Sequence, residues 1–434
     1  MNSARISVVG CGWVGLVTAL GFAENGHQVE AFDKDSVRIQ RLRNRDYPIA
    51  EAGVEEAAER ADQLSFHTTD TLPSPETEFI FLTLPTPGRE DGSADVTCLE
   101  ECLAWLRNAE FDAPPVLVLR STVPPGTAEW TERRLAQTMP DAFPVVSNPE
   151  FLQEGKALED FRRPARIVIG ASRREIAQRV ADLYAFTDSP VVQTDCRTAE
   201  LTKYASNAFL AMRISFANEL AGVAEALGAN VKGMLGAVGM DPRVGSRYLN
   251  PGIGYGGSCL TKDVAALVEF GGRAGQSMQL ARATGAVNER QREQALSLLY
   301  DWLDGVSGRR IAIIGMAFKP GTNDLRDAPA VHLALQLHDA GAQLQAWDPS
   351  VTQDQLSNVP GIQLTCNLYE AFENADAAVL CTEWPEAMAI DFERVASVMR
   401  GKLLIDGRYG WHPEQAEEHS LRVVRIGSRE AVGS

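Results

Sequence analysis

The feature that most constrains the fold is a glycine turn between a short β-branched run and a helical segment. Ile6-Ser7-Val8-Val9 predicts a strand, Gly10-Cys11-Gly12-Trp13-Val14-Gly15 follows at once, and Leu16 to Asn25 has helical character. A second predicted strand, Gln28 to Phe32, ends at Asp33, at about the 20-residue spacing of a βαβ unit with a ligand-binding turn. The chain is therefore expected to begin with a parallel α/β fold.

The three glycines and Asp33 suit a dinucleotide. In such a turn the first glycine (Gly10) permits the tight bend, the second (Gly12) lets backbone approach a pyrophosphate, and the third (Gly15) lets helix and strand pack closely. The helix N-terminus would face the phosphates. Asp33 would accept from both ribose hydroxyls and would repel a 2′-phosphate, so the pattern predicts NAD rather than NADP. A glycine-rich packing turn beside a surface aspartate is the alternative.

Composition limits the class of protein. The 434 residues allow about three domains, and 41 Lys+Arg against 58 Asp+Glu give a net charge of −17. That acidity argues against binding to nucleic acid or to an anionic membrane, because both need a basic face. The stretch from Cys196 to Asp263 nevertheless carries more basic than acidic residues, so an anionic substrate remains possible. The 7 scattered cysteines form no CxxC pair, so we expect neither a disulfide framework nor a metal site, and a cytoplasmic location.

Patterning along the chain predicts three parts. Strands are expected at Phe79–Leu84, Val116–Leu119, Pro144–Ser147 and Ile167–Ile169. A long helical pattern from Thr198 to Leu227 is followed by a glycine-rich irregular stretch and by helices from Leu260 to Leu303. Arg310–Gly315, Gln343–Asp348 and Ala375–Leu380 then repeat the first strand pattern. The predicted fold is α/β, with two Rossmann-like doubly wound sheet domains (1–195, binding NAD, and 301–434) joined by a central all-helical domain (196–300).

Candidate chemical groups lie in the central part. Lys203 and Asn207 stand at i and i+4 and share a helix face, although Lys203 alone reads equally well as a snorkelling surface lysine. Cys259 follows a glycine run and is expected to begin a helix, with Asp263 one turn later. A thiol at a helix N-terminus near a lysine has a lowered pKa, which favours the nucleophilic thiolate. A packed, inert cysteine is the bland alternative.

Six segments resemble the nucleotide-sugar 6-dehydrogenases of the UDP-glucose/GDP-mannose dehydrogenase family, in the family's order. They are Gly10–Gly15 with Asp33; Ser121–Thr127; Asn148–Gly155; Glu200–Phe209; the Gly256-Gly257-Ser258-Cys259 segment; and Phe318–Arg326. Asp241-Pro242-Arg243-Val244-Gly245 resembles the UDP-glucose branch more than the GDP-mannose branch.

The resemblance implies oxidation of UDP-glucose to UDP-glucuronate with two NAD and one water. Cys259 would add to an intermediate aldehyde, and the resulting thiohemiacetal would be oxidised to a thioester and hydrolysed. Lys203 and Asn207 would stabilise oxyanions, and Asp263, with Lys203 or a water, would be the base. Thr122 and Glu154 would orient or activate the water, although Glu154 could equally be a plain capping or surface acid.

The resemblance also implies two sets of binding residues. Those expected to contact NAD are Gly10, Gly12, Val14, Gly15, Asp33, Arg38, Thr86, Thr122, Glu154, Lys262 and Arg326. Those expected to contact the UDP-sugar are Glu150, Phe151, Leu152, Glu154, Lys203, Asn207, Arg243, Tyr248, Leu249, Asn250, Pro251, Gly252, Gly256 and Lys319, with Arg243 reaching the site of a partner subunit. The alternative interpretation of Arg38 and Lys319 is that each is a solvated surface charge without a binding role.

Two positions depart from the family pattern. Thr261 stands before Lys262-Asp263, where the family commonly has proline, and Ala50-Glu51-Ala52-Gly53 replaces Tyr-Glu-Pro-Gly. Neither change removes a catalytic group, but the second is expected to loosen a loop beside the cofactor.

The open alternatives differ in chemistry. The same mechanism could act on another nucleotide sugar such as GDP-mannose. An ordinary two-electron dehydrogenase would not need Cys259 or the third domain, and a decayed NAD-binding scaffold would not need the full catalytic set. We further expect a homodimer or higher homo-oligomer through the central helical domain, and a role in polysaccharide synthesis.

Overall fold

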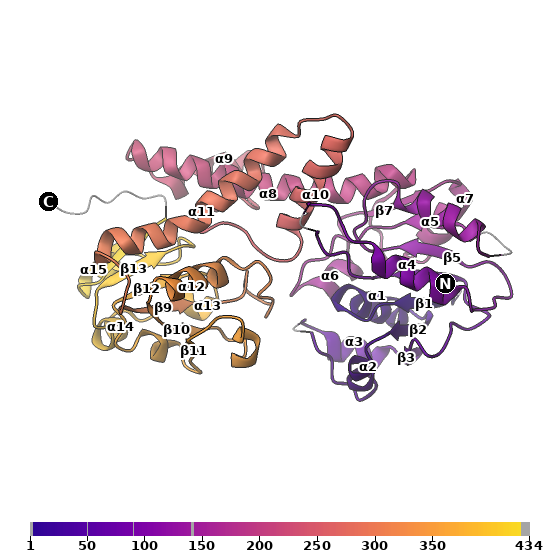
Figure 1. Ribbon diagram of the computed structural model, residues 1–434, viewed down its shortest axis with the longest axis horizontal. Helices are drawn as coiled ribbons and strands as arrows, with labels where there is room; N and C mark the ends of the chain where they lie inside the picture. The colour runs from indigo at the N-terminus through magenta and orange to yellow at the C-terminus, as the bar shows by residue number, and fades with distance from the viewer. Residues whose placement is uncertain (1–2, 50, 90, 140–142, 427–434) are drawn as a thin grey trace. The chain divides into compact units, whose positions relative to one another are not determined.

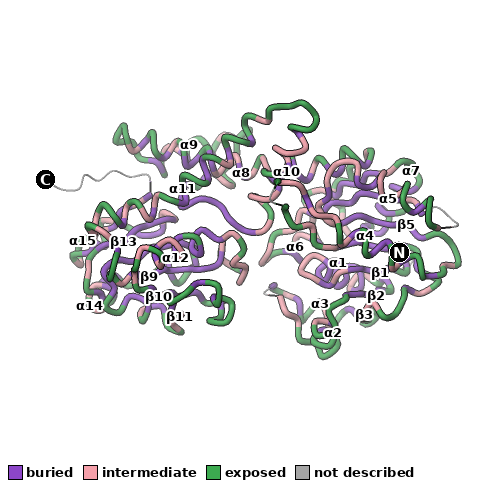
Figure 2. Tube along the Cα trace, in the orientation of Figure 1, coloured by how far each residue is buried: buried purple, intermediate pink, exposed green. Residues whose placement is uncertain are grey.

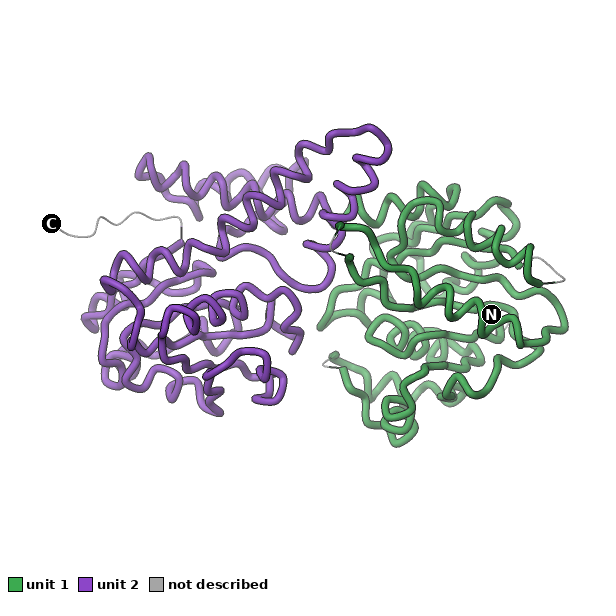
Figure 3. Tube along the Cα trace, viewed as in Figure 1, with its two compact units in different colours: residues 1–206 green, residues 207–434 purple. Residues whose placement is uncertain are grey.

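The computed structural model describes residues 3–49, 51–89, 91–139 and 143–426. The chain forms two compact units, residues 1–206 and 207–434 (Figure 3). The boundary between them lies inside one long helix, α8 (Cys196–Ala226). The division into three domains near residues 195 and 300 therefore stays a prediction.

The first unit is built on an eight-stranded sheet in the order β3-β2-β1-β4-β5-β6-β7-β8 (Figure 1). Its strands are β1 (Arg5–Val9), β2 (Gln28–Asp33), β3 (Leu64–Thr68), β4 (Phe79–Leu82), β5 (Val116–Leu119), β6 (Val145–Ser147), β7 (Ile167–Ala171) and β8 (Val191–Thr194). Its helices before α8 are α1 (Trp13–Glu24), α2 (Ser36–Arg43), α3 (Val54–Arg60), α4 (Thr97–Leu106), α5 (Thr127–Ala136), α6 (Ala157–Arg162) and α7 (Arg174–Asp182). Neighbouring strands are parallel along the sheet from β3 through β2, β1, β4 and β5 to β6, whereas β6 pairs antiparallel with β7.

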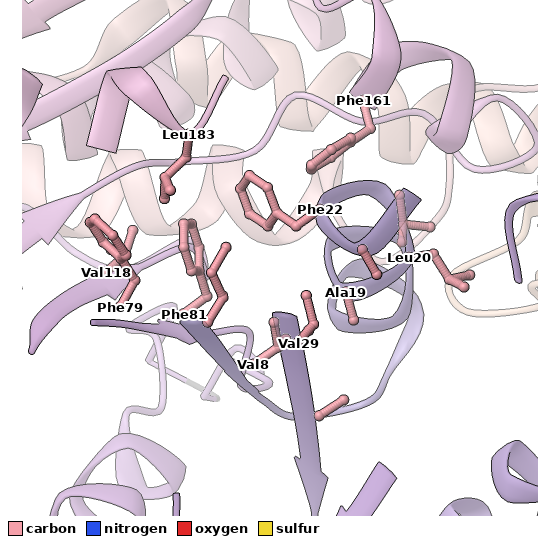
Figure 4. Close-up of a cluster of buried hydrophobic side chains, with 14 of the residues drawn as sticks. Val8, Ala19, Leu20, Phe22, Val29, Phe79, Phe81, Val118, Phe161 and Leu183 are labelled. Atoms are coloured by element: carbon pink, nitrogen blue, oxygen red, sulfur yellow. The ribbon is translucent and has the colours of Figure 1, made fainter. Parts of the chain in front are cut away.

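The core of this unit explains why its central strands read as unbroken apolar runs. Val8, Val29 and Phe81 on neighbouring strands lie under α1, whose Phe22 stands edge-on to Phe161 of α6 at 5.1 Å between ring centroids (Figure 4). Strands covered on both faces must be apolar on both faces. The central strands of both sheets are accordingly buried, while solvent reaches the edge strands β3 and β8 and the outer helix surfaces (Figure 2).

The second unit joins a helical region to a six-stranded sheet, β11-β10-β9-β12-β13-β14. The helical region continues α8 with α9 (Val231–Met240), α10 (Leu260–Arg273) and α11 (Gln279–Leu303). The strands are β9 (Arg310–Ile314), β10 (Gln343–Trp347), β11 (Ile362–Leu364), β12 (Ala377–Leu380), β13 (Leu403–Asp406) and β14 (Arg422–Arg425). The remaining helices are α12 (Pro329–Asp339), η1 (Gln353–Leu356), η2 (Leu368–Phe372), α13 (Pro385–Met388), α14 (Phe392–Val398) and α15 (Pro413–Glu418).

The second sheet repeats the strand order of the first six strands of the first sheet. The third strand lies at one edge, and the chain returns past the first strand to place the fourth beside it, which is the doubly wound order. The predicted repeat and fold class are therefore confirmed: two parallel-sheet α/β regions with a helical region between them in the chain.

One prediction about the helical region is wrong. The glycine-rich stretch after Leu227 was expected to be irregular, yet α9 occupies Val231–Met240. The Asn230 side chain caps it by accepting from the Gly233 N–H at 2.9 Å, and Val231 and Leu235 pack on the small residues of α8. Burial and a cap thus outweigh the low helix propensity of glycine.

Candidate active site

The glycine turn after β1 has the geometry that a pyrophosphate needs. A Cβ on Gly10 would lie 2.7 Å from the Thr83 carbonyl oxygen, and one on Gly15 would lie 1.7 Å from the Gly10 oxygen. These two glycines are therefore fixed by packing. Around Gly12, which caps α1, no atom lies within 4 Å of such a Cβ, so this position leaves space for a ligand. The turn fits NAD.

Asp33 is buried at the carboxyl end of β2 and faces the same turn. Its Oδ2 accepts from the Cys11 N–H at 2.8 Å and from Arg38 Nη1 at 3.0 Å. Arg38 is thus held beside Asp33. An arginine that was only a solvated surface charge would not require this contact. The predicted ribose ligand and the predicted neighbouring cation lie together.

Thr86 and Thr122 meet beyond the carboxyl ends of β4 and β5. The Thr86 hydroxyl donates to the Thr122 carbonyl oxygen at 2.8 Å. Because β4 and β5 follow β1 in the sheet, both threonines lie on the edge that carries the glycine turn. Ligands of doubly wound sheets bind at this edge.

Glu150 and Lys203 form a buried ion pair in the first unit. Lys203 Nζ donates to Glu150 Oε1 at 2.8 Å, and the two side chains are 5 % and 9 % exposed. Burial acts to raise the pKa of Glu150, but the ammonium of Lys203 and the Leu152 N–H outweigh it and hold that pKa below its ordinary value. Lys203 is therefore not a snorkelling surface lysine, which was the alternative interpretation of this position.

The segment after Glu150 holds the other predicted residues of this unit. Leu152 N–H donates to Glu150 Oε2 at 2.6 Å, and the guanidinium of Arg166 lies 3.8 Å from the Phe151 ring centroid. Glu154 is half-buried in the turn before α6.

Glu51, within the segment that departs from the family pattern, holds this same turn, and the expected loosening of its loop stays a prediction. Its carboxylate accepts from the Gly155 N–H at 2.9 Å and from the Ala157 N–H at 2.6 Å. It is buried, and that burial raises its pKa above the ordinary value. The departure at 50–53 therefore keeps its structural group, although Ala50 lies outside the described residues.

The long helix α8 includes both Lys203 and Asn207, as predicted. Asn207 belongs to the second unit, where its Nδ2 donates to Asp263 Oδ2 at 2.6 Å. Lys262 Nζ lies 2.7 Å from the other oxygen, and Asp263 is 1 % exposed. Asn207 and Asp263 are thus brought together. Lys262, predicted to contact NAD, is bonded to Asp263.

Cys259 caps the N-terminus of α10, as the sequence predicted. Its carbonyl oxygen accepts from the Asp263 N–H at 2.9 Å, which is the first hydrogen bond of the helix. The side chain is exposed. A nucleophile in this position is accessible, and the helix N-terminus stabilises its anion.

One part of the set predicted to contact the UDP-sugar, the segment 248–257 with Lys319, lies at the carboxyl edge of the second sheet. Ile253 N–H donates to the Gly407 oxygen at 3.1 Å, just after β13. A Cβ on Gly257 would lie 2.8 Å from the Phe318 ring, beyond β9, and Lys319 Nζ lies 5.6 Å from that ring centroid. The other members of the segment are Tyr248, with φ +63°, the buried Leu249, Pro251, Gly252 and Gly256, and the exposed Asn250.

Two predicted arginines are held by aspartates two residues earlier. Arg243 forks onto Asp241, with Nη2 to Oδ2 at 2.6 Å, and its side chain is 88 % exposed. Arg326 forks onto Asp324 in the same way. The Arg326 carbonyl accepts from the Gly257 N–H at 3.0 Å, so this predicted NAD contact lies beside the segment that carries Cys259.

A cavity of about 890 Å³ lies at the opposite, amino edge of the second sheet. Its cations are engaged internally: Arg400 binds Asp376, and Arg309 and Lys402 donate to carbonyl oxygens of Leu303 and Ala396. Because doubly wound sheets bind ligands at the carboxyl edge, this cavity is not the candidate active site.

Within the described residues, no group of three or more His, Cys, Asp or Glu side chains could hold a metal. None of the helices in that part of the chain is long and apolar enough to span a bilayer.

Three models of the UDP-glucose/GDP-mannose dehydrogenase family match the chain in succession. The NAD binding domain matches residues 4–188, the central domain 197–290, and the UDP binding domain 312–413. The chain belongs to this family.

Individual members of the family are similar over the whole length. The UDP-glucose 6-dehydrogenase of Rhizobium meliloti is 39% identical, with 98% of this chain and 99% of that protein covered. The corresponding protein of Pseudomonas aeruginosa is 38% identical over 98% and 97%. The structure of a UDP-glucose dehydrogenase from Pyrobaculum islandicum is 36% identical with a TM-score of 0.91, over 99% of this chain and 98% of that one.

Sequence reasoning missed several buried groups behind the predicted site. Glu200 accepts from the Gly126 and Ala128 N–H groups at 2.6 and 2.8 Å and from the Ser147 hydroxyl at 3.0 Å, so it fastens α8 to the start of α5. Glu200 lies inside a quoted family segment, which was a usable signal. The half-buried Arg408 donates from Nε to the Cys381 oxygen at 2.7 Å, and its signal was a charged residue two positions after β13.

Proposed function

We propose that this chain oxidises UDP-glucose to UDP-glucuronate, using two NAD and one water. The observation that carries the proposal is Cys259 at the N-terminus of α10, one turn before a buried Asp263 that is hydrogen-bonded to Asn207. A two-electron alcohol dehydrogenase needs no such thiol, whereas a four-electron oxidation needs a nucleophile that retains the aldehyde. Membership of the UDP-glucose/GDP-mannose dehydrogenase family and the names of the similar proteins support the same activity.

Most of the proposed cofactor contacts fall to the first unit. The glycine turn, Val14, Asp33, Arg38, Thr86 and Thr122 would hold NAD, which when bound accepts one hydride from C6 in each of two oxidations. Asp33 would take the ribose hydroxyls. Lys262, Arg326 and Glu154 complete the proposed contacts.

The chain's own groups carry the remaining chemistry. Asp263, directly or with Lys203 or a water, would accept the proton of the C6 hydroxyl during the first oxidation. The Cys259 thiolate would then form a bond to C6 of the aldehyde while the carbonyl electron pair moves to oxygen. Lys203 and Asn207 would stabilise that oxyanion, and each such donor is worth about 3–4 kcal/mol in a site closed to water.

Hydrolysis returns the enzyme to its starting state. After the second oxidation C6 is a thioester of Cys259. A water oriented by Thr122 and Glu154 would attack C6, and the C–S bond would break to release the carboxylate and the thiolate. The covalent bond explains how the intermediate stays bound while the reduced cofactor is exchanged.

The substrate preference rests on the second unit. The segment Asp241–Gly245 resembles the UDP-glucose branch more than the GDP-mannose branch, and the family's UDP binding domain covers 312–413. The segment 248–257 and Lys319 are the proposed sugar-nucleotide contacts of this unit. With Phe151 and Leu152 they form the proposed UDP-sugar site. The test is a comparison of kcat/KM for UDP-glucose, GDP-mannose and UDP-N-acetylmannosamine. A clear preference for UDP-glucose supports the proposal, and a preference for either other sugar contradicts it.

We also propose a homodimer or higher homo-oligomer through the helical region. Phe209, Phe216 and Val223 recur every seven residues on α8 and are 54%, 50% and 52% exposed, and Leu227 is 78% exposed. Such a stripe on a long helix suits a like surface on a second copy. Light scattering with Phe216→Asp tests this, because the substitution should give monomers and an unchanged mass would refute it.

The scattered cysteines support a cytoplasmic location, and the product would serve polysaccharide synthesis.

A further inference from the structure

The segment that carries Cys259 has no regular structure, and its backbone is held by buried side chains of α11. Asn288 Oδ1 accepts from the Tyr255 N–H at 2.8 Å, and its Nδ2 donates to the Tyr255 oxygen at 3.2 Å. One turn along, Gln291 Nε2 donates to the Gly252 oxygen at 2.8 Å. Asn288 and Gln291 are 1% and 3% exposed. The path of the chain toward Cys259 is therefore set from α11.

A partly buried ionic cluster around Asp327 continues this support to the far side of Cys259. Arg292 of α11 donates to both Asp327 oxygens at 2.7 Å and to the Tyr255 carbonyl oxygen at 2.8 Å. His332 Nε2 lies 3.0 Å from Oδ1. Thr261, in the first turn of α10, donates its hydroxyl to Oδ2 at 2.5 Å. One carboxylate thus joins α10, α11 and α12.

The backbone of Asp327 is fitted to the same segment. Its φ is +51°, a conformation that few residues other than glycine adopt. A Cβ on Gly256 would lie 2.2 Å from the Asp327 carbonyl oxygen. The glycine run and Asp327 therefore touch, and neither can shift without moving the other.

The charge of Asp327 is secure in this setting. Burial alone acts to raise its pKa, but the hydrogen bonds from His332, Arg292 and Thr261 hold that pKa well below its ordinary value. The carboxylate is ionised wherever the enzyme works. The bond from the Thr261 hydroxyl is therefore made to a charged acceptor, which is the stronger kind.

We propose that Asp327 is a positioning residue which, through the Thr261 hydroxyl, fixes the first turn of α10 and so the direction of the Cys259 side chain. Thr261 occupies the position where the family commonly has proline, and a proline has no hydroxyl to donate to Asp327. The catalytic consequence rests on the proposed function, whereas the effect on the Cys259 thiol does not.

The test compares Thr261→Val, which removes the hydroxyl at constant shape, with Thr261→Ser, which keeps it. Thr138→Val is the matched control, because the Thr138 hydroxyl donates to the Arg134 and Leu135 carbonyl oxygens at the end of α5, away from Asp327 and Cys259. We expect Thr261→Val to slow the alkylation of Cys259 by iodoacetamide about tenfold, as measured by mass spectrometry. This factor corresponds to the free energy lost with one hydrogen bond to a charged group. With UDP-glucose, Thr261→Val should lower kcat by a similar factor and leave KM within about twofold, and Thr261→Ser should restore both.

The outcomes separate this inference from the proposed function. Wild-type alkylation of Cys259 in Thr261→Val overturns the positioning role, whatever the activity. Slow alkylation in a protein that oxidises no nucleotide sugar keeps the positioning role and sinks the proposed function. If Thr261→Val lowers the melting temperature steeply, Thr261→Ala provides the second variant. It also removes the hydroxyl and has the higher helix propensity, so wild-type alkylation in a folded Thr261→Ala protein would likewise overturn the inference.

Discussion

The Glu150–Lys203 pair offers a quantitative test of the buried site. Glu150→Gln keeps the shape of the side chain and removes its charge, which leaves the Lys203 ammonium in a buried place without that carboxylate. Removing one partner of a buried pair costs about 3–5 kcal/mol. For a unit of about 200 residues, this corresponds to a fall in melting temperature of roughly 6–20 °C at neutral pH.

The pH dependence of that loss has a definite sign. The pKa of Glu150 is lowered in the folded protein, so its stabilisation is present above the unfolded value and is lost as pH falls through the folded value. The gap in melting temperature between wild type and Glu150→Gln should therefore be full at pH 7 and close on acidification. The control is Glu129→Gln, which removes an exposed pair with Arg197 and should change little. A gap below about 2 °C at pH 7, or one that widens in acid, refutes the reasoning.

Three further substitutions test separate roles. Cys259→Ala should block the second oxidation and leave NAD binding, followed by calorimetry, intact; carboxylate formation at the wild-type rate would exclude the covalent step. Asp263→Asn should lower kcat about 10²–10⁴-fold with little change in KM, and a wild-type kcat would remove Asp263 from the chemistry. Asp33→Ser removes the charge that repels a 2′-phosphate and leaves Arg38 in place, so the ratio of kcat/KM for NADP to that for NAD should rise at least about tenfold; an unchanged ratio would show that Asp33 does not select the cofactor.

Local pattern predicted the doubly wound class of the two sheets and their central strands, but not β3, β8, β11, β13 and β14. The strand-glycine-helix start and its repetition at Arg310 predicted the doubly wound order, because apolar runs and turn residues are local signals. Pattern failed at α9, where three glycines hide a helix whose stability comes from Asn230 and from packing on α8. Tertiary contacts of this kind leave no periodicity to read.

The candidate site was predictable in its groups but not in their supports. The spacing of Cys259 and Asp263 announced a helix N-terminus, and the structure has one. The carboxylates that hold the surrounding backbone, Glu51, Glu200 and Asp327, gave no comparable signal. Each is far in sequence from the groups that it binds, so only the fold brings them together.

The central claim is a four-electron oxidation through a covalent intermediate on Cys259. The most direct measurement is the number of NADH formed for each UDP-glucose consumed, with the product identified by mass spectrometry. We expect two NADH for each UDP-glucose, with UDP-glucuronate as the product. One NADH with release of the aldehyde would contradict the claim.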